Sequence, residues 1–249
     1  MYITIDGVKC VAQEGEYILP VARRNNIYIP TLCHSDSLPG QANCRLCIVE
    51  VIEKGRNKVV VSCVFPVKEG IEVKTNTEKI RNIRKTIIKL LSARVPECEE
   101  LKRMREEYGV RDFSRFKTSP EEKCILCGLC VRACDELGNS AISTVNRGIT
   151  KEVSTPYNEP SVDCIGCGAC AYVCPTGAIQ IEEANGKRRI WNKEFTLIRC
   201  SSCGKYFITK EQVEYINKKV DKKLDITMCE NCRKIFTTEK FIDVCKNIL

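Results

Sequence analysis

The apolar and polar positions of the first 78 residues predict a small domain rich in β-structure. The expected elements are a hairpin over Met1–Val11, a helix over Tyr17–Asn26, a strand pair over Cys44–Ile52 and Lys58–Val64, and a further strand over Gly70–Lys74. The dipeptide Asp6-Gly7 between two short apolar runs indicates the hairpin. A turn at Gly55 is expected to join the strand pair.

A different periodicity follows and predicts a helical bridge over residues 79–118. Apolar residues recur at helical spacing among lysines and arginines, at Ile80, Ile83, Ile87, Leu90 and Leu91. We expect Pro96 to end this helix, and a second charged helix to follow at about Glu99–Tyr108. A pair of solvated surface helices is the plainer interpretation, and it is compatible with a bridge.

Two cysteine runs mark another module over residues 119–184. The pattern C-x2-C-x2-C-x3-C occurs over Cys124–Cys134 and again over Cys164–Cys174, which is an internal repeat. Residues 185–249 are expected to hold a basic linker at Gly186–Ile198, with the only tryptophan, Trp191, and a module around two C-x-x-C pairs. The predicted fold class is therefore α+β, with a small zinc-ribbon-like module at the end.

Cysteine usage restricts the class of protein further. The chain has 249 residues and 19 cysteines, of which 16 fall into four groups of four. Pairs at C-x-x-C spacing, in a chain of this size and without a recognisable secretory segment, argue against a disulfide scaffold. Because no stretch of about 18 apolar residues occurs, we expect no membrane span. These features predict a cytoplasmic metalloprotein in a reducing compartment.

The net charge has to be corrected for metal binding. Forty lysines and arginines against 32 acidic residues give +8, which by itself would suggest a nucleic-acid partner. Metal-bound cysteine is a thiolate, however, and each occupied four-cysteine site carries roughly −2. Four such sites bring the total close to zero, so we expect no nucleic-acid binding.

The doubled cysteine run is the ligand pattern of bacterial two-cluster ferredoxins, in which the fourth cysteine of each run holds the other cluster. The predicted ligands of the first [4Fe–4S] cluster are Cys124, Cys127, Cys130 and Cys174. Those of the second are Cys134, Cys164, Cys167 and Cys170. Small neighbours at Gly128, Gly166 and Gly168 let backbone N–H groups approach the sulfurs. Zinc is disfavoured because its sites need only four ligands and would not require triple runs.

A third group is predicted to hold a [2Fe–2S] cluster. Its members are Cys33, Cys44, Cys47 and Cys63. A C-x2-C pair with a distant fourth cysteine follows the plant-type pattern, although the first gap has ten residues here and not four. The spacing alone leaves zinc as a competitor. The order of a hairpin, a helix, a cysteine-bearing loop and further strands favours a small ferredoxin barrel.

At this point the sequence shows a family resemblance. The segments Cys33–Gly40 (CHSDSLPG) and Asn43–Val51 (NCRLCIVEV) resemble the N-terminal [2Fe–2S] domain of the respiratory complex I large subunit. NAD-linked iron-only hydrogenases and NAD-dependent formate dehydrogenases share that domain, and place a helical bridge and a two-[4Fe–4S] domain after it. The resemblance covers about residues 1–182. It implies a plant-type (β-grasp) fold and a redox role for the third cysteine group.

The chain departs from these families in two places. They usually carry an extra [4Fe–4S] site on the bridge, held by one histidine and three cysteines. Here Arg94–Cys98 (RVPEC) lies at that place, so only Cys98 remains and we expect no cluster. The large relatives also continue into a catalytic domain, whereas about 70 residues follow the ferredoxin module here. The chain resembles the small iron–sulfur subunits of electron-bifurcating complexes.

The fourth group consists of two separated C-x2-C pairs, a zinc-ribbon pattern. The predicted zinc ligands are Cys200, Cys203, Cys229 and Cys232. Mononuclear iron and a further cluster are the redox alternatives. A charged helix is expected between the pairs, over Gln212–Lys223. Because aromatic residues do not alternate with the basic ones here, we favour a module that docks a partner subunit over one that binds nucleic acid.

The remaining candidate residues have plainer interpretations. Cys10, Cys98 and Cys245 are expected to be buried apolar residues. The only histidine, His34, follows a predicted [2Fe–2S] ligand and could influence it, but an ordinary loop residue is the favoured interpretation.

The sequence predicts an electron-transfer subunit with no substrate site of its own. No nucleophile–base pair, P-loop or dinucleotide fingerprint is found. The family resemblance implies that electrons pass between a flavin- and NAD(P)-binding subunit and either ferredoxin or a catalytic subunit of a transhydrogenase, hydrogenase or formate dehydrogenase. A free-standing ferredoxin-like carrier is the alternative, and a sensor that binds nucleic acid through the ribbon is a third hypothesis.

Overall fold

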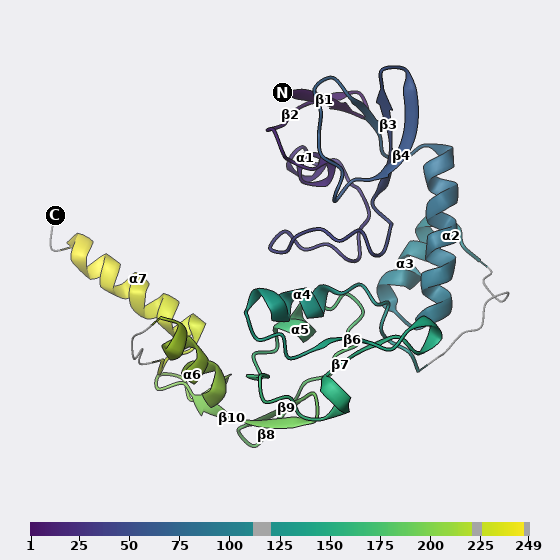
Figure 1. Cartoon of the computed structure of the whole chain (residues 1–249). Coiled ribbons are helices and arrows are strands. Elements are labelled where there is room, and N and C mark those ends of the chain that lie inside the picture. Colours follow the sequence, from purple (N-terminus) through teal and green to yellow (C-terminus); the bar gives the residue numbers. More distant parts are fainter. Residues whose placement is uncertain (112–120, 221–225, 247–249) are drawn as a thin grey trace. The chain divides into compact units, whose positions relative to one another are not determined.

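The computed structural model describes residues 1–111, 121–220 and 226–246, without the side chains of 243–246 (Figure 1). It divides into two compact units. The first unit comprises Met1–Ala133, Asn146–Glu152 and Val173–Ala178. The second unit comprises Cys134–Val145, Val153–Tyr172 and Ile179–Leu249. Residues 221–223 of the helix predicted over Gln212–Lys223 lie outside the described residues. The side chain of Cys245 also lies outside them.

A mixed five-stranded sheet forms the N-terminal part of the first unit. Its strands are β1 (Tyr2–Ile5), β2 (Val8–Val11), β3 (Ile48–Glu53), β4 (Arg56–Val61) and β5 (Glu72–Lys74), in the order β2-β1-β5-β3-β4. Strands β1 and β5 pair in parallel, and the other neighbours pair antiparallel. The predicted hairpin is confirmed, and Asp6 and Gly7 both have positive φ, as its tight turn requires.

The core of this part lies between the sheet and helix α1 (Ile18–Arg24). Alternate strand residues such as Ile3, Ile5 and Val49 are buried with Leu19 and Val21 of the helix, because side chains of one strand face share a period of two. Strand β3 begins four residues later than predicted. The preceding residues from Cys44 to Cys47 belong instead to the cysteine-bearing loop.

Two helices, α2 (Glu78–Arg94) and α3 (Glu99–Tyr108), pack against each other in the first unit. Helix α2 starts at the cap residue Thr77, whose hydroxyl accepts the Ile80 N–H, and ends before Pro96 as predicted. The buried face differs from the predicted stripe. It contains Ile80, Arg84, Ile88 and Ser92, whereas Leu90 is exposed.

The second unit contains a four-stranded antiparallel sheet. Its strands are β8 (Glu182–Ala184), β9 (Lys187–Ile190), β10 (Lys193–Arg199) and β11 (Tyr206–Thr209), in the order β11-β10-β9-β8. The stretch that we interpreted as a linker, Gly186–Ile198, is therefore regular structure. Its alternating residues Phe195 and Leu197 are buried, and this burial stabilises strands rather than a solvated connection.

The remaining described elements are helices, 3-10 turns and one strand pair. Helix α4 (Leu129–Glu136) includes the boundary of the two units in the chain, and α5 (Ala169–Tyr172), α6 (Lys210–Lys219) and α7 (Glu230–Lys246) belong to the second unit. Strands β6 (Ser143–Val145) and β7 (Glu152–Ser154) pair with each other, and short 3-10 turns cover Gly148–Thr150 and Pro156–Asn158. Helix α6 begins two residues before its predicted start. No described helix has the length and apolar character needed to cross a membrane.

Candidate metal centres

The predicted [2Fe–2S] cysteines are buried together in the first unit. Cys33, Cys44, Cys47 and Cys63 are each at most 6% exposed, and the Cys44 N–H donates to Cys33 Sγ at 3.3 Å. The hydrogen bond from the Cys44 thiol lowers the pKa of Cys33 to about 6. The Cys47 thiol lowers the pKa of Cys63 in the same way, and the charges of Cys33 and Cys44 also act on Cys63. The four sulfurs therefore form one electrostatically connected group.

Two buried arginines surround this cysteine-bearing loop. Arg84 donates to the carbonyls of Leu46 at 3.0 Å and Ile48 at 2.7 Å, and Arg132 donates to the Cys33 carbonyl at 2.8 Å. Within the described ranges, neither guanidinium forms an ion pair. A buried cation needs a counter-charge, so this loop fits a group that is anionic when held by four thiolates.

The first unit also holds the predicted ligands of the first [4Fe–4S] cluster. Cys124, Cys127, Cys130 and Cys174 all lie in it. The N–H groups of Leu126 and Ala178 donate to the sulfurs of Cys124 and Cys174, each at 3.3 Å. Burial, and to a smaller extent the charge of Cys174, raises the pKa of the Cys127 thiol to about 11. Cys174 therefore shares a compact unit with three cysteines of the other run.

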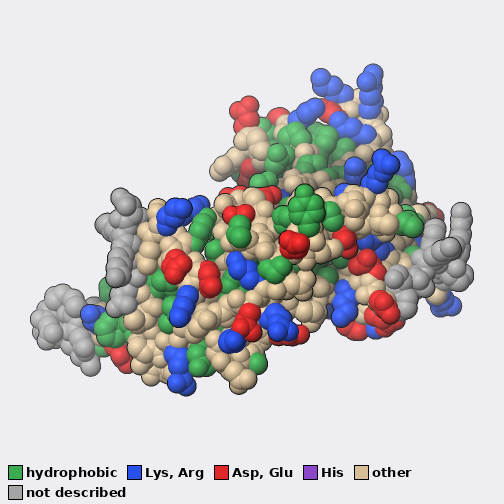
Figure 2. Space-filling model, turned by 60° about the horizontal axis from the view of Figure 1, so that its bottom comes forward, with side chains coloured by type: hydrophobic (Ala, Val, Ile, Leu, Met, Phe, Trp, Pro, Cys, Tyr) green, Lys and Arg blue, Asp and Glu red, His purple; other side chains and the backbone are tan. Residues whose placement is uncertain are grey.

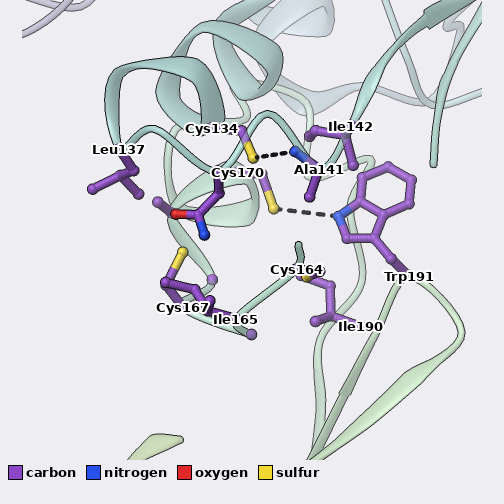
Figure 3. A pocket seen from close by; sticks show the side chains of 14 residues that line it. Cys134, Leu137, Ala141, Ile142, Cys164, Ile165, Cys167, Cys170, Ile190 and Trp191 are labelled. Atoms are coloured by element: carbon purple, nitrogen blue, oxygen red, sulfur yellow. Dashed lines mark hydrogen bonds between the residues drawn. The ribbon is translucent and has the colours of Figure 1, made fainter. Parts of the chain in front are cut away.

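The second unit holds the other four cysteines of the doubled run. Cys134, Cys164, Cys167 and Cys170 line one cavity (Figure 3). The Ala141 N–H donates to Cys134 Sγ at 3.2 Å, and the Trp191 indole N–H donates to Cys170 Sγ at 3.4 Å. N–H groups directed at sulfur suit a thiolate-held cluster. In both units, therefore, the fourth cysteine of one run lies with three cysteines of the other.

The C-terminal group has the compactness of a site for one ion. The sulfurs of Cys200, Cys203, Cys229 and Cys232 all lie within 4.8 Å of one another, and the Cys203 and Cys229 sulfurs are 3.8 Å apart. Tetrahedral zinc with bonds of about 2.3 Å would place its sulfurs roughly 3.8 Å apart. The N–H groups of Cys203 and Cys229 lower the pKa of Cys200 to about 6, which favours the thiolate that a metal needs.

The remaining candidates are mainly structural. Cys10 and Cys98 are buried, as predicted. The His34 side chain is 8% exposed, its Nε2 lies 3.2 Å from an Asp36 carboxylate oxygen, and its Nδ1 has no partner in the described part of the chain. Arg94 of the former cluster region donates to the Cys124 carbonyl at 2.7 Å, so this region supports the ligand loop of the first [4Fe–4S] site.

Basic and acidic side chains are mixed on the surface. On the face drawn in Figure 2, lysine and arginine side chains are interspersed with aspartate and glutamate. Several basic residues have acidic partners, as in the pairs Lys58–Glu53, Arg188–Glu183 and Lys187–Glu194. These basic side chains are therefore partly neutralised by acidic neighbours.

Sequence reasoning missed the residues that support the ligand loops. The sequence analysis assigns no role to Arg84 or Arg132, and it places Trp191 and Lys193 in the predicted linker. The dipeptide Asn185-Gly186, a strong hairpin signal, could have identified the second pair, since it connects β8 to β9. No comparable signal in the sequence identifies the two arginines.

Comparison with known proteins identifies the class. Residues 1–78 match the family described as "2Fe-2S iron-sulfur cluster binding domain", and residues 123–178 match the "4Fe-4S dicluster domain". The chain is thus an iron–sulfur protein with both kinds of cluster-binding domain.

Its relatives are long subunits of redox enzymes. The chain is 35% identical over 209 residues to the HndD subunit of the NADP-reducing hydrogenase of Solidesulfovibrio fructosivorans, covering 71% of this chain and 35% of that protein. It is 33% identical to a subunit of the NADH-quinone oxidoreductase of Rhizobium meliloti, with 81% and 26% covered. The alpha subunit of the NADPH-Fe(3+) oxidoreductase of Geobacter sulfurreducens is 31% identical, with 86% and 27% covered.

A solved structure agrees with these relatives. A chain of an NAD+-reducing [NiFe]-hydrogenase, crystallised in the H2-reduced state, superposes with a TM-score of 0.62 at 27% identity, covering 71% of this chain and 85% of that one. The predicted resemblance is confirmed: the chain belongs to the family of iron–sulfur subunits that includes the large subunit of complex I, the NADH-quinone oxidoreductase. It spans between 26% and 35% of the length of the curated relatives described above.

Proposed function

We propose that this chain is the electron-transfer subunit of a cytoplasmic NAD(P)H-linked oxidoreductase complex. It would pass single electrons between a flavin- and NAD(P)-binding subunit and either ferredoxin or a catalytic subunit. The observation that carries this proposal is the grouping of twelve ferredoxin-type cysteines into three sets, each with N–H donors or buried cations around it. The relatives named above are subunits of enzymes that act on NADH, NADPH or hydrogen.

The proposed cofactors are one [2Fe–2S] cluster, two [4Fe–4S] clusters and one zinc ion. When bound, each cluster supplies a centre that accepts and donates one electron at a time. Cys33, Cys44, Cys47 and Cys63 would hold the [2Fe–2S] cluster. Cys124, Cys127, Cys130 and Cys174 of the first unit would hold one [4Fe–4S] cluster. Cys134, Cys164, Cys167 and Cys170 of the second unit would hold the other.

The first unit connects two of these sites directly. Asn43, which precedes the ligand Cys44, donates from its amide to the Cys127 carbonyl at 2.9 Å. Arg132, between two cysteines of the first run, donates to the Cys33 carbonyl. The charge of Cys33 also acts on the pKa of Cys127. The two hydrogen bonds hold the [2Fe–2S] loop against the first [4Fe–4S] loop. A short distance between the two proposed clusters would favour electron transfer between them.

We propose a structural role for the zinc site. Its four sulfurs lie within 4.8 Å of one another, and one pair has the separation of about 3.8 Å that a single tetrahedral ion requires. A cluster contains several metal atoms between its ligands and needs wider separation. All four positions are taken by cysteine, so no position is left open for a substrate or water.

A serine at one [2Fe–2S] ligand tests the proposal in the assembled complex. Cys44→Ser should remove the [2Fe–2S] signal from electron paramagnetic resonance spectra and reduce NAD(P)H-linked turnover at least tenfold, because electrons would lose one centre of the path. The matched control is Cys10→Ser, since Cys10 is buried in the same domain but belongs to no ligand group. Unchanged turnover after loss of the signal would show that this cluster is not on the route.

The complex itself has to be identified by its partners. Anaerobic purification from the native source should yield this chain together with a flavoprotein that has a nicotinamide site. A chain that emerges alone with about ten irons (2 + 4 + 4) would favour a free-standing carrier over a subunit.

A further inference from the structure

The second [4Fe–4S] site is bordered by the β9–β10 hairpin, which the sequence analysis took for a linker. Trp191 and Ile190 line its cavity together with the four cysteines (Figure 3). Trp191 and Asn192 form the turn of this hairpin, and both have positive φ. This turn directs the indole towards the cysteines, and its N–H donates to Cys170 Sγ at 3.4 Å.

A lysine of the same hairpin carries a positive charge to the loop before these cysteines. Lys193 Nζ donates to three carbonyls, those of Ser161 at 2.9 Å, Val162 at 3.3 Å and Cys164 at 2.7 Å. Its three donors are therefore all directed at one loop. The last of these bonds places a positive charge beside the backbone of Cys164, a predicted ligand of the second cluster.

Further contacts from the sheet fix the position of the loop that Lys193 binds. Arg188 Nη1 donates to the Gly166 carbonyl at 2.7 Å, and Thr209 Oγ1 donates to the Ile165 carbonyl at 2.6 Å. The Phe195 ring lies so close to Gly166 that a Cβ there would come within 2.7 Å of it. Strands β9, β10 and β11 thus all contact this loop.

We propose that Trp191 and Lys193 are positioning residues that set the reduction potential of the second [4Fe–4S] site; the inference rests on the proposed cluster at that site. Reduction adds one electron there and forms or breaks no bond. The added charge falls partly on the ligand sulfurs, where an N–H donor and a nearby cation stabilise it more than the oxidised state. Both residues therefore make the site easier to reduce.

The test is a redox titration of the full chain with its clusters, followed by electron paramagnetic resonance. Trp191→Phe keeps an aromatic ring but removes the donor, and Lys193→Gln removes the charge. Each should make one of the two [4Fe–4S] potentials more negative, so that this site is about tenfold less reduced at a fixed solution potential. A tenfold change corresponds to about 59 mV for one electron. The other [4Fe–4S] potential should not move.

Two control variants match these changes. Tyr172→Phe alters an aromatic residue that is 93% exposed and two positions from Cys170. Arg189→Gln removes a cation from the same hairpin at an exposed position. Neither control should shift either potential, because neither side chain is placed to donate to the ligand loop.

The outcomes separate this inference from the cofactor proposal. Two [4Fe–4S] signals in the wild-type chain support the cofactors, and one signal alone would overturn that proposal. With both present, unshifted potentials in Trp191→Phe and Lys193→Gln, or equal shifts of both clusters, would overturn the role of the two residues. If Trp191→Phe loses iron, Lys193→Gln decides the question, and Lys193→Arg should restore the wild-type potential.

Discussion

Arg84 is among the largest fully buried side chains in the described part of the molecule, although it carries a full charge. Its guanidinium donates to the carbonyls of Leu46 and Ile48 and lies 3.3 Å from the Tyr108 hydroxyl. These groups come from the cysteine-bearing loop, from β3 and from α3. One side chain therefore connects the helical pair to the [2Fe–2S] site.

We predict that Arg84→Met destabilises the chain by about 3 kcal/mol, because two buried carbonyls lose their donors at roughly 1–3 kcal/mol each. In a chain of this size that corresponds to a fall of roughly 6–12 °C in the melting temperature. Thermal unfolding of the anaerobic protein, followed at the [2Fe–2S] absorption, measures it. The neighbouring substitution Lys85→Met, at a partly exposed position, should shift the melting temperature by less than a third as much. Equal shifts would contradict the role of Arg84.

The cysteine ligands and the buried arginines differ in how far the sequence predicts them. Cysteine spacing is a local pattern with few alternative meanings, and each ligand set predicted from the ferredoxin-type runs lies within one compact unit. Arg84 repeats with Ile80 and Ile88 at helical spacing, yet its type suggests a solvent-facing position. Only the tertiary structure shows that the loop around Leu46 supplies the acceptors for its charge. A residue whose burial depends on a distant partner has no local signal.

At the scale of elements, β3 and α2 are joined through a buried carboxylate. Glu50 accepts the Thr77 hydroxyl at 2.6 Å, and Lys79 Nζ lies 3.2 Å from it. Thr77 is also the cap residue of α2. The hydrogen bond from Thr77, and then the charge of Lys79, keep the pKa of Glu50 below its usual value although burial opposes this. The carboxylate thus fixes the helix start against the strand.

This lowered pKa predicts a pH-dependent contribution of Glu50. Since the folded-state pKa lies below the unfolded one, the stabilisation is complete above the ordinary glutamate pKa of about 4.3. It is lost as the pH falls through the lowered value. Amides in the first turn of α2 should exchange about tenfold faster in Glu50→Gln than in wild type at pH 7, a difference of about 1.4 kcal/mol.

The ratio between variant and wild type should narrow as the pH falls below about 4.3. Glu53→Gln is the control, because it removes a carboxylate of the same strand that pairs with Lys58 and Lys68 instead. A ratio that stays constant with pH would mean that the Glu50 charge does not hold the helix.

The β9–β10 hairpin shows where the prediction of elements failed and why. Its basic residues suggested a linker, but Phe195 and Leu197 alternate with polar residues and are buried. Asn185-Gly186 also gave a hairpin signal. Three consecutive basic residues, Lys187–Arg189, favoured a linker, although the alternation of apolar and polar residues is typical of a strand. The sequence could not predict that the hairpin packs against the 161–166 loop, because this contact depends on the tertiary structure.

At the scale of the molecule, the C-terminal module shares a sheet with the second [4Fe–4S] site. Strand β10 leads into Cys200, and Cys203 precedes β11. The same two strands supply Lys193, Phe195 and Thr209 to the 161–166 loop. A metal bound at the turn between β10 and β11 would therefore also stabilise the two strands that contact this loop. The turn, the strands and the loop all lie in the second unit.

We therefore predict that loss of the proposed zinc causes a loss of iron. Cys203→Ser should abolish the zinc content and, by loosening the sheet, lower the iron from about ten to about six per chain during anaerobic dialysis. The four lost irons would come from the second [4Fe–4S] site, because the ligands of the other two clusters all lie in the first unit. Metal analysis measures the zinc and iron contents, and Mössbauer spectroscopy shows which type of cluster has lost its iron. Ser201→Ala, an exposed change in the same turn, should retain both metals. A variant that loses zinc yet keeps ten irons would show that β10 and β11 support the loop without the ion, and that the module serves the complex through its surface alone.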